Sequence, residues 1–155
     1  MCSSDLDILS VLVTYPSLPA KPVKDLIAPG RAHPGAINFS SGRRGTVGHV
    51  AGASSGAMAT TRYTLVAHKG LHQALMDVMA GHVQFQFAII PNLLPHVHSG
   101  KLNMLAQTGD SRSPSALQYP TIQESGLPGF VLRSPFSFLA PANLDRKSTR
   151  LNSSH

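Results

Sequence analysis

Residues 37–46 read Ile-Asn-Phe-Ser-Ser-Gly-Arg-Arg-Gly-Thr, and the architecture can be worked out from this stretch outward. The apolar start predicts a short strand over Ile37–Ser40. The polar, glycine-bearing run Ser40–Thr46 predicts a loop, and Val47–Met58 then predicts a helix that three glycines and a serine pair weaken. A strand, a short loop and a helix form the repeating unit of α/β proteins.

The loop has the composition of an anion site. Ligands of open α/β sheets bind at the carboxyl ends of strands, where backbone N–H groups converge and a helix N-terminus adds positive potential. Ser40, Ser41 and Thr46 offer hydroxyl donors, and Gly45 lets the backbone approach a ligand closely. Thr46 also suits the N-cap of the helix. An ordinary capped turn explains the same residues, and both interpretations stay open at this point.

The rest of the chain repeats the alternation of strands and helices. The apolar patterns predict strands over residues 8–14, 62–66, 83–89 and 102–107, and an extended segment over 130–139. They predict helices over 21–28, from Leu71 to Gly81, and over 91–98, with a helical turn at 120–125. Pro29-Gly30 is expected to stop the first helix. This order favours an α/β fold with a mainly parallel sheet flanked by helices.

Composition narrows the class of protein. A chain of 155 residues with 42% hydrophobic residues can build the core of one domain, which excludes a disordered chain. No apolar run approaches the roughly 18 residues of a membrane span. The net charge is +6, but the basic residues are dispersed and no basic stripe carries interleaved aromatic residues. Cys2 is the single cysteine, so no disulfide can form within the chain.

Both ends of the chain have an unusual coding property. Residues 145–155 can be encoded by DNA that resembles a sequencing-library adapter, and residues 1–6 can be encoded by its complementary strand. We therefore expect residues 1–6 and 145–155 to be adapter-derived additions, which should be excluded from fold reasoning. The informative protein is then the segment from Asp7 to Leu144.

The chain resembles the periplasmic solute-binding proteins of the tripartite tricarboxylate transporter system, the Bug family. A series of short motifs in family order carries the resemblance: 16–21 (PSLPAK), 33–35 (HPG), 38–41 (NFSS), Gly45-Thr46 with His49, 68–70 (HKG), 80–84 (AGHVQ), 94–96 (LPH), 99–102 (SGKL), 112–114 (RSP), 119–121 (YPT), 124–130 (ESGLPGF) and 139–142 (LAPA).

The resemblance implies one lobe of a two-lobed, type II Venus-flytrap receptor. Residues 7–130 would form the second lobe, and 131–144 would be a return crossover toward a missing first lobe. Such receptors close by a hinge motion around a ligand. The implied function is capture of a small organic carboxylate in the periplasm for membrane transporter subunits, by a full-length monomer without cofactor, metal or enzymatic activity. The implied ligand-binding residues are Ser40, Ser41, Arg43, Arg44, Gly45, Thr46, Lys69 and Gly70.

The chain departs from the family pattern at two places in the site. The family usually has Gly-Asn-Gly where this chain has Arg43-Arg44-Gly45. Two residues that tolerate positive φ are thereby lost, so the loop could adopt another conformation, while two guanidiniums could bind a carboxylate or point into solvent. After the strand at 83–87 the family often has an acidic residue, and here Ala88 predicts the loss of a polar ligand contact.

Other functions have less support from the residues. His96 and His98, with His82 nearby, suggest a metal site, but no further ligand at zinc-site spacing and no carboxylate or Cys support is evident. Ser41, His68 and Asp77 suggest a hydrolase, but no nucleophile elbow is present, and few carboxylates are available for acid–base chemistry. Nucleic-acid binding would suit the net charge but not its dispersal. A truncated coding fragment without function is the main alternative.

Overall fold

The computed structural model describes residues 5–20 and 22–137, and its centre is a five-stranded sheet in the order β4-β3-β5-β2-β6. Strand β3 pairs in parallel with β4 and β5, whereas β2 pairs antiparallel with β5 and β6. Four strands therefore run in one direction and β2 runs against them, which confirms the mainly parallel sheet. The strands are β2 (Ser10–Thr14), β3 (Ile37–Ser41), β4 (Tyr63–Ala67), β5 (Phe85–Ile89) and β6 (Asn103–Gln107).

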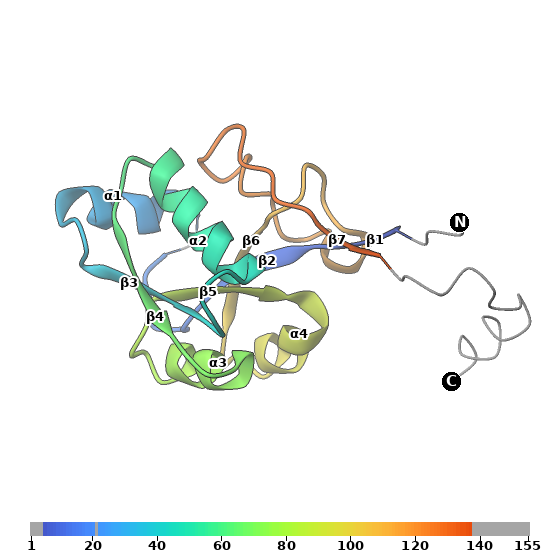
Figure 1. The fold of residues 1–155 in the computed structure, drawn as a ribbon, viewed down its shortest axis with the longest axis horizontal. Coiled ribbons are helices and arrows are strands. Elements are labelled where there is room, and N and C mark those ends of the chain that lie inside the picture. The colour runs from blue at the N-terminus through green and yellow to red at the C-terminus, as the bar shows by residue number, and fades with distance from the viewer. Residues whose placement is uncertain (1–4, 21, 138–155) are drawn as a thin grey trace, which may run out of the picture.

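Helices cover both faces of the sheet (Figure 1). One face carries α1 (Lys24–Ala32) and α2 (Val47–Met58), and the other carries α3 (Leu71–Met79) and α4 (Ile90–His98). Two buried apolar clusters fill the two layers, and successive residues of β2 alternate between them: Leu12 belongs to the first cluster, and Val11 and Val13 to the second. This period of two is what a strand covered on both faces requires.

A second, two-stranded sheet joins the two ends of the described chain. Strand β1 (Asp5–Ile8) pairs antiparallel with β7 (Ser134–Ser137). The predicted single strand over 8–14 is therefore wrong in its start: the chain breaks at Leu9 into β1 and β2, which belong to different sheets. The predicted extended segment 130–139 is confirmed only over β7, and residues 138 and 139 lie outside the described residues.

Helix α2 has the predicted bounds, and its glycines have a role in packing. Gly48, Gly52 and Gly56 recur every four residues and are all buried. A Cβ on Gly48 would lie 2.9 Å from the Phe87 carbonyl oxygen, and one on Gly52 would lie 2.2 Å from the Phe39 ring. The glycines therefore let the helix backbone approach the sheet to a distance that a side chain would prevent.

The prediction that Pro29-Gly30 ends the first helix is wrong. Helix α1 continues through both residues to Ala32, with the backbone N–H of His33 bonded to the Pro29 carbonyl at 3.0 Å. Tertiary contacts hold this last turn. The Arg31 Nε donates to the carbonyl of Ala59 at 2.7 Å, and a Cβ on Gly30 would lie 3.0 Å from Thr61. These contacts outweigh the one helical hydrogen bond that a proline removes.

The segment between β6 and β7 contains the 3-10 helix η1 (Pro114–Ala116) and is organised by one buried amide. The Nε2 of Gln107 donates to the carbonyls of Ala116 and Tyr119 at 2.7 and 2.9 Å, and its Oε1 accepts from the N–H of Ser113 at 2.9 Å. The helical turn expected at 120–125 is a turn in the structure. No helix in the described residues is long and apolar enough to cross a membrane.

Candidate anion site at the carboxyl edge of the sheet

The loop between β3 and α2 is closed by hydroxyl groups. The Oγ of Ser41 and the Oγ1 of Thr46 lie 2.7 Å apart, and both reach the carbonyl oxygen of Arg43, at 3.1 and 2.9 Å. Thr46 occupies the N-cap position of α2, but its hydroxyl makes no capping hydrogen bond to the helix. These two hydroxyls hold the loop in shape, so the expected Thr46 side-chain cap is wrong.

Gly45 is the residue that lets the loop turn. Its φ is +85°, in the region that favours glycine, and no atom lies within 4 Å of the position of a Cβ. Its N–H donates to the Nδ1 of His49 at 2.9 Å, and the His49 ring stacks on Phe39 with 6.5 Å between centroids. Among the described residues only Thr60 has a positive φ without being glycine, so Arg43 and Arg44 cause no backbone strain.

His49 therefore has a packing and capping role. It forms a second closure of the loop, between the first turn of α2 and Gly45. The Nδ1 atom must be unprotonated to accept this hydrogen bond, which places the proton of the neutral ring on Nε2.

Two helix N-termini meet at this loop. Helices α2 and α3 follow β3 and β4, whose carboxyl ends share one edge of the sheet because the strands are parallel. The N–H of His68 donates to the Ser41 carbonyl at 2.9 Å, and a Cβ on Gly42 would lie 3.0 Å from the backbone nitrogen of Leu71. The first N–H groups of both helices have no intrahelical partner and add positive potential at this edge.

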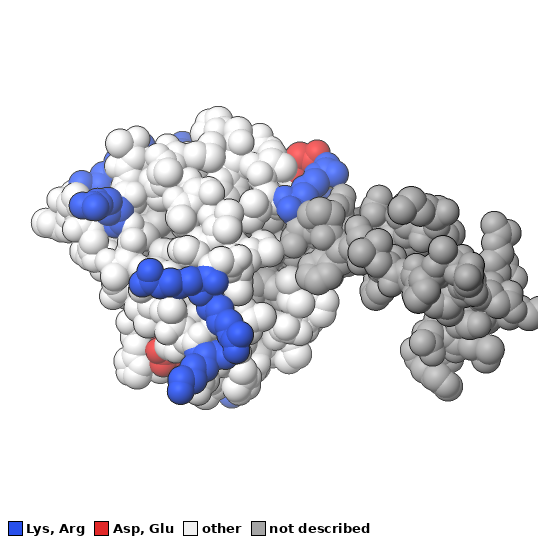
Figure 2. Space-filling model, viewed as in Figure 1, with Lys and Arg blue, Asp and Glu red and all other residues white. Residues whose placement is uncertain are grey.

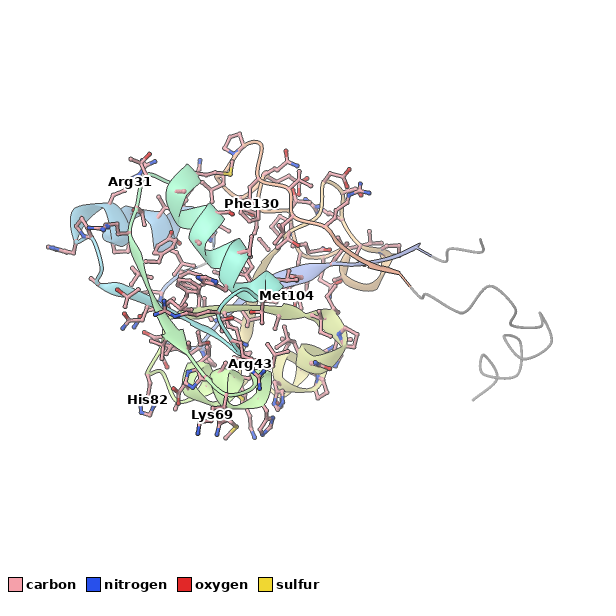
Figure 3. The ribbon with its side chains drawn as sticks, in the orientation of Figure 1. Arg31, Arg43, Lys69, His82, Met104 and Phe130 are labelled. Atoms are coloured by element: carbon pink, nitrogen blue, oxygen red, sulfur yellow. The ribbon has the colours of Figure 1, made fainter. Side chains whose placement is uncertain are left out.

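Three cations surround the same loop. Arg43, Arg44 and Lys69 are exposed, and no hydrogen bond or ion pair of their side chains is found within residues 5–20 and 22–137. Figure 3 places Arg43 and Lys69 close together beside α3, and Figure 2 shows a continuous band of Lys and Arg side chains on this face. Gly70 is the N-cap of α3, so Lys69 lies directly before that helix. The arrangement can bind an anion without a metal.

Ser40 does not belong to the exposed loop. It is 0% exposed and lies inside β3, and its Oγ donates to the carbonyl of Ala74 in α3 at 3.1 Å. Its hydroxyl anchors α3 to the sheet. Gly42 was not singled out from the sequence, although its contact with Leu71 brings the two helix N-termini together. The position of this glycine directly after the strand was the one signal in the sequence that could have indicated the close contact.

The catalytic and metal alternatives find no assembled site in the described residues. Asp77 lies 3.3 Å from His68 and 3.6 Å from His82, but the Ser41 hydroxyl bonds to Thr46 and Arg43 instead of to His68. Within the described part of the chain, no group of three His, Cys, Asp or Glu side chains is placed to hold a metal ion.

Shifted pKa values lie outside this loop. Burial raises the pKa of Tyr63 to about 12, while the positive charge of Arg31 opposes the rise. The hydrogen bond from Arg133 lowers the pKa of Asp110, and the N–H of Thr121 together with Arg112 lowers the pKa of Glu124. These carboxylates tie the segment after β6 together and are not part of the candidate anion site.

Known proteins resemble this chain over nearly its whole length. It is 31% identical to protein BugT of Bordetella pertussis over 149 residues, which are 96% of this chain and 46% of BugT. The structure of R. palustris Rpa4515 with adipate is 29% identical with a TM-score of 0.84, and it covers 96% of this chain and 50% of its own. MatC of Rhodopseudomonas palustris with bound malate shares the fold, with 22% identity and a TM-score of 0.79.

The chain thus spans about half the length of the relatives that it matches. Residues 6–153 match the family described as "Tripartite tricarboxylate transporter family receptor". The fold, the relatives and this match agree, and the chain belongs to the tripartite tricarboxylate transporter receptor family, which includes the Bug proteins.

Proposed function

We propose that this chain is the carboxylate-binding lobe of a periplasmic receptor that captures a small organic carboxylate for a tripartite tricarboxylate-type transporter. The meeting of two helix N-termini and three exposed cations at one loop carries the proposal. The similarity to a receptor structure with adipate, at 29% identity, supports the ligand class. The whole protein would be a monomer without enzymatic activity.

Each proposed site residue has a task that follows from its place. The first N–H groups of α2 and α3 donate to the carboxylate, with Gly45 and Gly70 keeping the approach open because no atom lies within 4 Å of a Cβ at either position. Arg43, Arg44 and Lys69 supply charge, and a guanidinium can bind a carboxylate through two parallel hydrogen bonds. Ser41 and Thr46 hold the loop, and Ser40 holds α3, so these three residues position the site.

The paired strands β1 and β7 suggest how the lobe is connected to the rest of the receptor. Both lie at the ends of the described chain and extend away from the helices and the five-stranded sheet (Figure 1). We propose that residues 7–130 form this lobe and that residues 131–144 begin the return to the other lobe. Hinge closure between the two lobes would then bury the ligand.

Titration of the 155-residue chain with adipate, followed through backbone amide NMR shifts, tests the site. One lobe leaves much of the ligand in water, so we expect a dissociation constant no smaller than about 1 mM. This corresponds to a binding free energy of roughly 4 kcal/mol. The shifts should concentrate in residues 42–48 and 69–72. Arg43→Gln and Lys69→Gln should each weaken binding about threefold, since an exposed ion pair contributes less than about 1 kcal/mol.

Arg62→Gln is the matched control, because Arg62 is exposed and precedes β4 at the opposite edge of the sheet. This change should leave the affinity for adipate unchanged. Equal losses in all three variants would mean that net charge, not the loop, attracts the ligand. A thermal unfolding curve of the same sample addresses the alternative of a truncated fragment without function, since that alternative predicts no cooperative transition.

A further inference from the structure

A pocket of about 120 Å³ opens between α3 and α4, over the end of β5. Its walls are the apolar side chains of Leu71 and Leu75 from α3, Ala88 from β5 and Leu93 from α4. An apolar cavity of roughly 150 Å³ holds benzene, so this pocket has room for an alkyl group of about four carbons.

The pocket offers mainly apolar surface to a ligand. No Lys, Arg, Asp or Glu is found among the described residues that line it, and its two exposed polar residues, His72 and Asn92, lie where it opens to water. Gln86 also borders the pocket, but both polar atoms of its amide are buried and do not face a ligand. A charged group inside would lose its water without gaining a counter-charge, so the pocket favours an uncharged carbon chain.

The small side chain of Ala88 leaves this space open. Phe85 and Phe87 belong to the apolar cluster under α1 and α2, so Gln86 and Ala88 point to the other face of the sheet, toward α3 and α4. Ala88 is half-buried and packs against the second apolar cluster. A longer side chain at this position would fill the pocket.

Leu71 joins the pocket to the candidate anion site. Its side chain lines the pocket, while its backbone nitrogen and its Cγ lie 3.0 and 3.2 Å from the position of a Cβ on Gly42 in the loop. Leu71 is 46% exposed at the first position of α3. A carboxylate held by the first N–H groups of α3 would therefore have its carbon chain beside Leu71, and the chain would cover this side chain as it enters the pocket.

We propose that this lobe selects monocarboxylates with an apolar tail, whose carboxylate binds at the loop and whose carbon chain enters the pocket between α3 and α4. This inference rests on the proposed carboxylate function and adds the class of ligand to it. The distribution of charge sets the orientation of the ligand, because Arg43, Arg44 and Lys69 surround the loop whereas the pocket lining contains no Lys or Arg.

Chain length tests the proposal at constant ligand charge. The 155-residue chain is titrated with acetate, butyrate and hexanoate, and the backbone amide shifts of residues 42–48 give the dissociation constants. A fully buried methylene strengthens binding about fourfold. The pocket is open to water on one side, so the four added methylenes, at half burial, should make hexanoate bind about fifteenfold more tightly than acetate. Equal affinities for the three compounds would overturn the proposal.

Hexanoate and adipate have the same number of carbons and differ in charge. The second carboxylate of adipate should strengthen binding about threefold through the exposed cations, but it keeps the chain out of the apolar pocket. Hexanoate should therefore bind about fivefold more tightly than adipate. Adipate that binds as tightly as hexanoate would contradict the selection of monocarboxylates.

Ala88→Leu fills the pocket and should bring the ratio of the hexanoate and acetate affinities within twofold of one. Ala57→Leu is the matched control, because Ala57 is exposed on α2, at the other face of the sheet. The control should keep the ratio of the parent chain. A ratio that Ala88→Leu leaves unchanged would reject the assignment of the carbon chain to this pocket.

The neutral probe n-butanol tests the pocket without the anion site. It should shift the methyl resonances of Leu71 and Leu93, but not those of Leu117, which is 59% exposed and lies outside the pocket lining. Carboxylates that bind at the loop, with no butanol shift or an equal shift at Leu117, would reject the pocket and keep the carboxylate function. Butanol in the pocket without any carboxylate at the loop would reject the carboxylate function, and with it the selection.

Discussion

Gly52→Ala separates helix propensity from packing in α2. Alanine stabilises a helix interior by about 1 kcal/mol relative to glycine, so propensity alone predicts a more stable protein. The structure predicts the opposite, because the new Cβ would lie 2.2, 2.5 and 2.8 Å from three carbons of the Phe39 ring. Carbon atoms in contact are normally about 3.5–4.0 Å apart, so the ring or the helix must move by more than an ångström.

The Phe39 ring has little room to move. It is 2% exposed and stacks on Phe85, with 5.5 Å between centroids, and on His49 from α2 itself. Overpacking of such a core costs about 1–3 kcal/mol, and the closeness of this contact puts the cost at about 3. After the gain of about 1 kcal/mol in propensity, the net loss is about 2 kcal/mol. At 2–4 °C per kcal/mol, the melting temperature should fall by roughly 4–8 °C.

Thermal unfolding followed by circular dichroism measures this change, with Ala53→Gly as the control. Ala53 is exposed in the same helix, so the control should lose only about 1 kcal/mol of helix propensity. Adding Phe39→Leu to Gly52→Ala should relieve the clash, and the two changes together should cost less than their sum. A Gly52→Ala protein that melts above the parent would refute the close approach of α2 to the sheet.

Two further measurements test backbone strain and burial. Gly45→Ala should lower the free energy of unfolding measured in urea by about 1–2 kcal/mol, because alanine is strained at a φ of +85°. Gly70→Ala, at φ −168° and with equally open space, should be nearly neutral. Equal losses in the two variants would contradict this assignment of strain. Burial raises the pKa of Tyr63 from 10.0 to about 12, so the folded state keeps the phenol proton to a higher pH than the unfolded chain does. The free energy of unfolding should therefore fall between pH 10 and 12, by at most about 2.7 kcal/mol. Tyr63→Phe is the control, because it has no phenol proton to lose.

Elements that depend on a local pattern of apolar residues could be predicted from the sequence. The alternating apolar residues around β5 and the helical spacing of Leu71, Leu75 and Val78 placed these elements close to their observed bounds. The reversed direction of β2 could not be read in the same way, because a buried strand has the same composition in either direction.

Tertiary contacts decided the places where the sequence misled. Proline and glycine normally end a helix, yet α1 continues through Pro29 because the last turn packs on Thr61 and bonds to Ala59 through Arg31. The glycines of α2 lower its propensity but are required by the distance of the helix from the sheet. Gln86 follows the pattern of a solvent-facing strand residue, and only the positions of α3 and α4 bury it.

The end of β3 explains why the proposed anion site needs its two consecutive serines. Successive residues of a strand point to opposite faces, so Ser40 bonds to the Ala74 carbonyl in α3, while Ser41 bonds to Thr46 at the start of α2. One strand end thus fixes two helix N-termini relative to each other, from opposite sides of the sheet. A shift of β3 by one residue would exchange these contacts and separate the donors, so the register of β3 on β4 and β5 sets the geometry of the site.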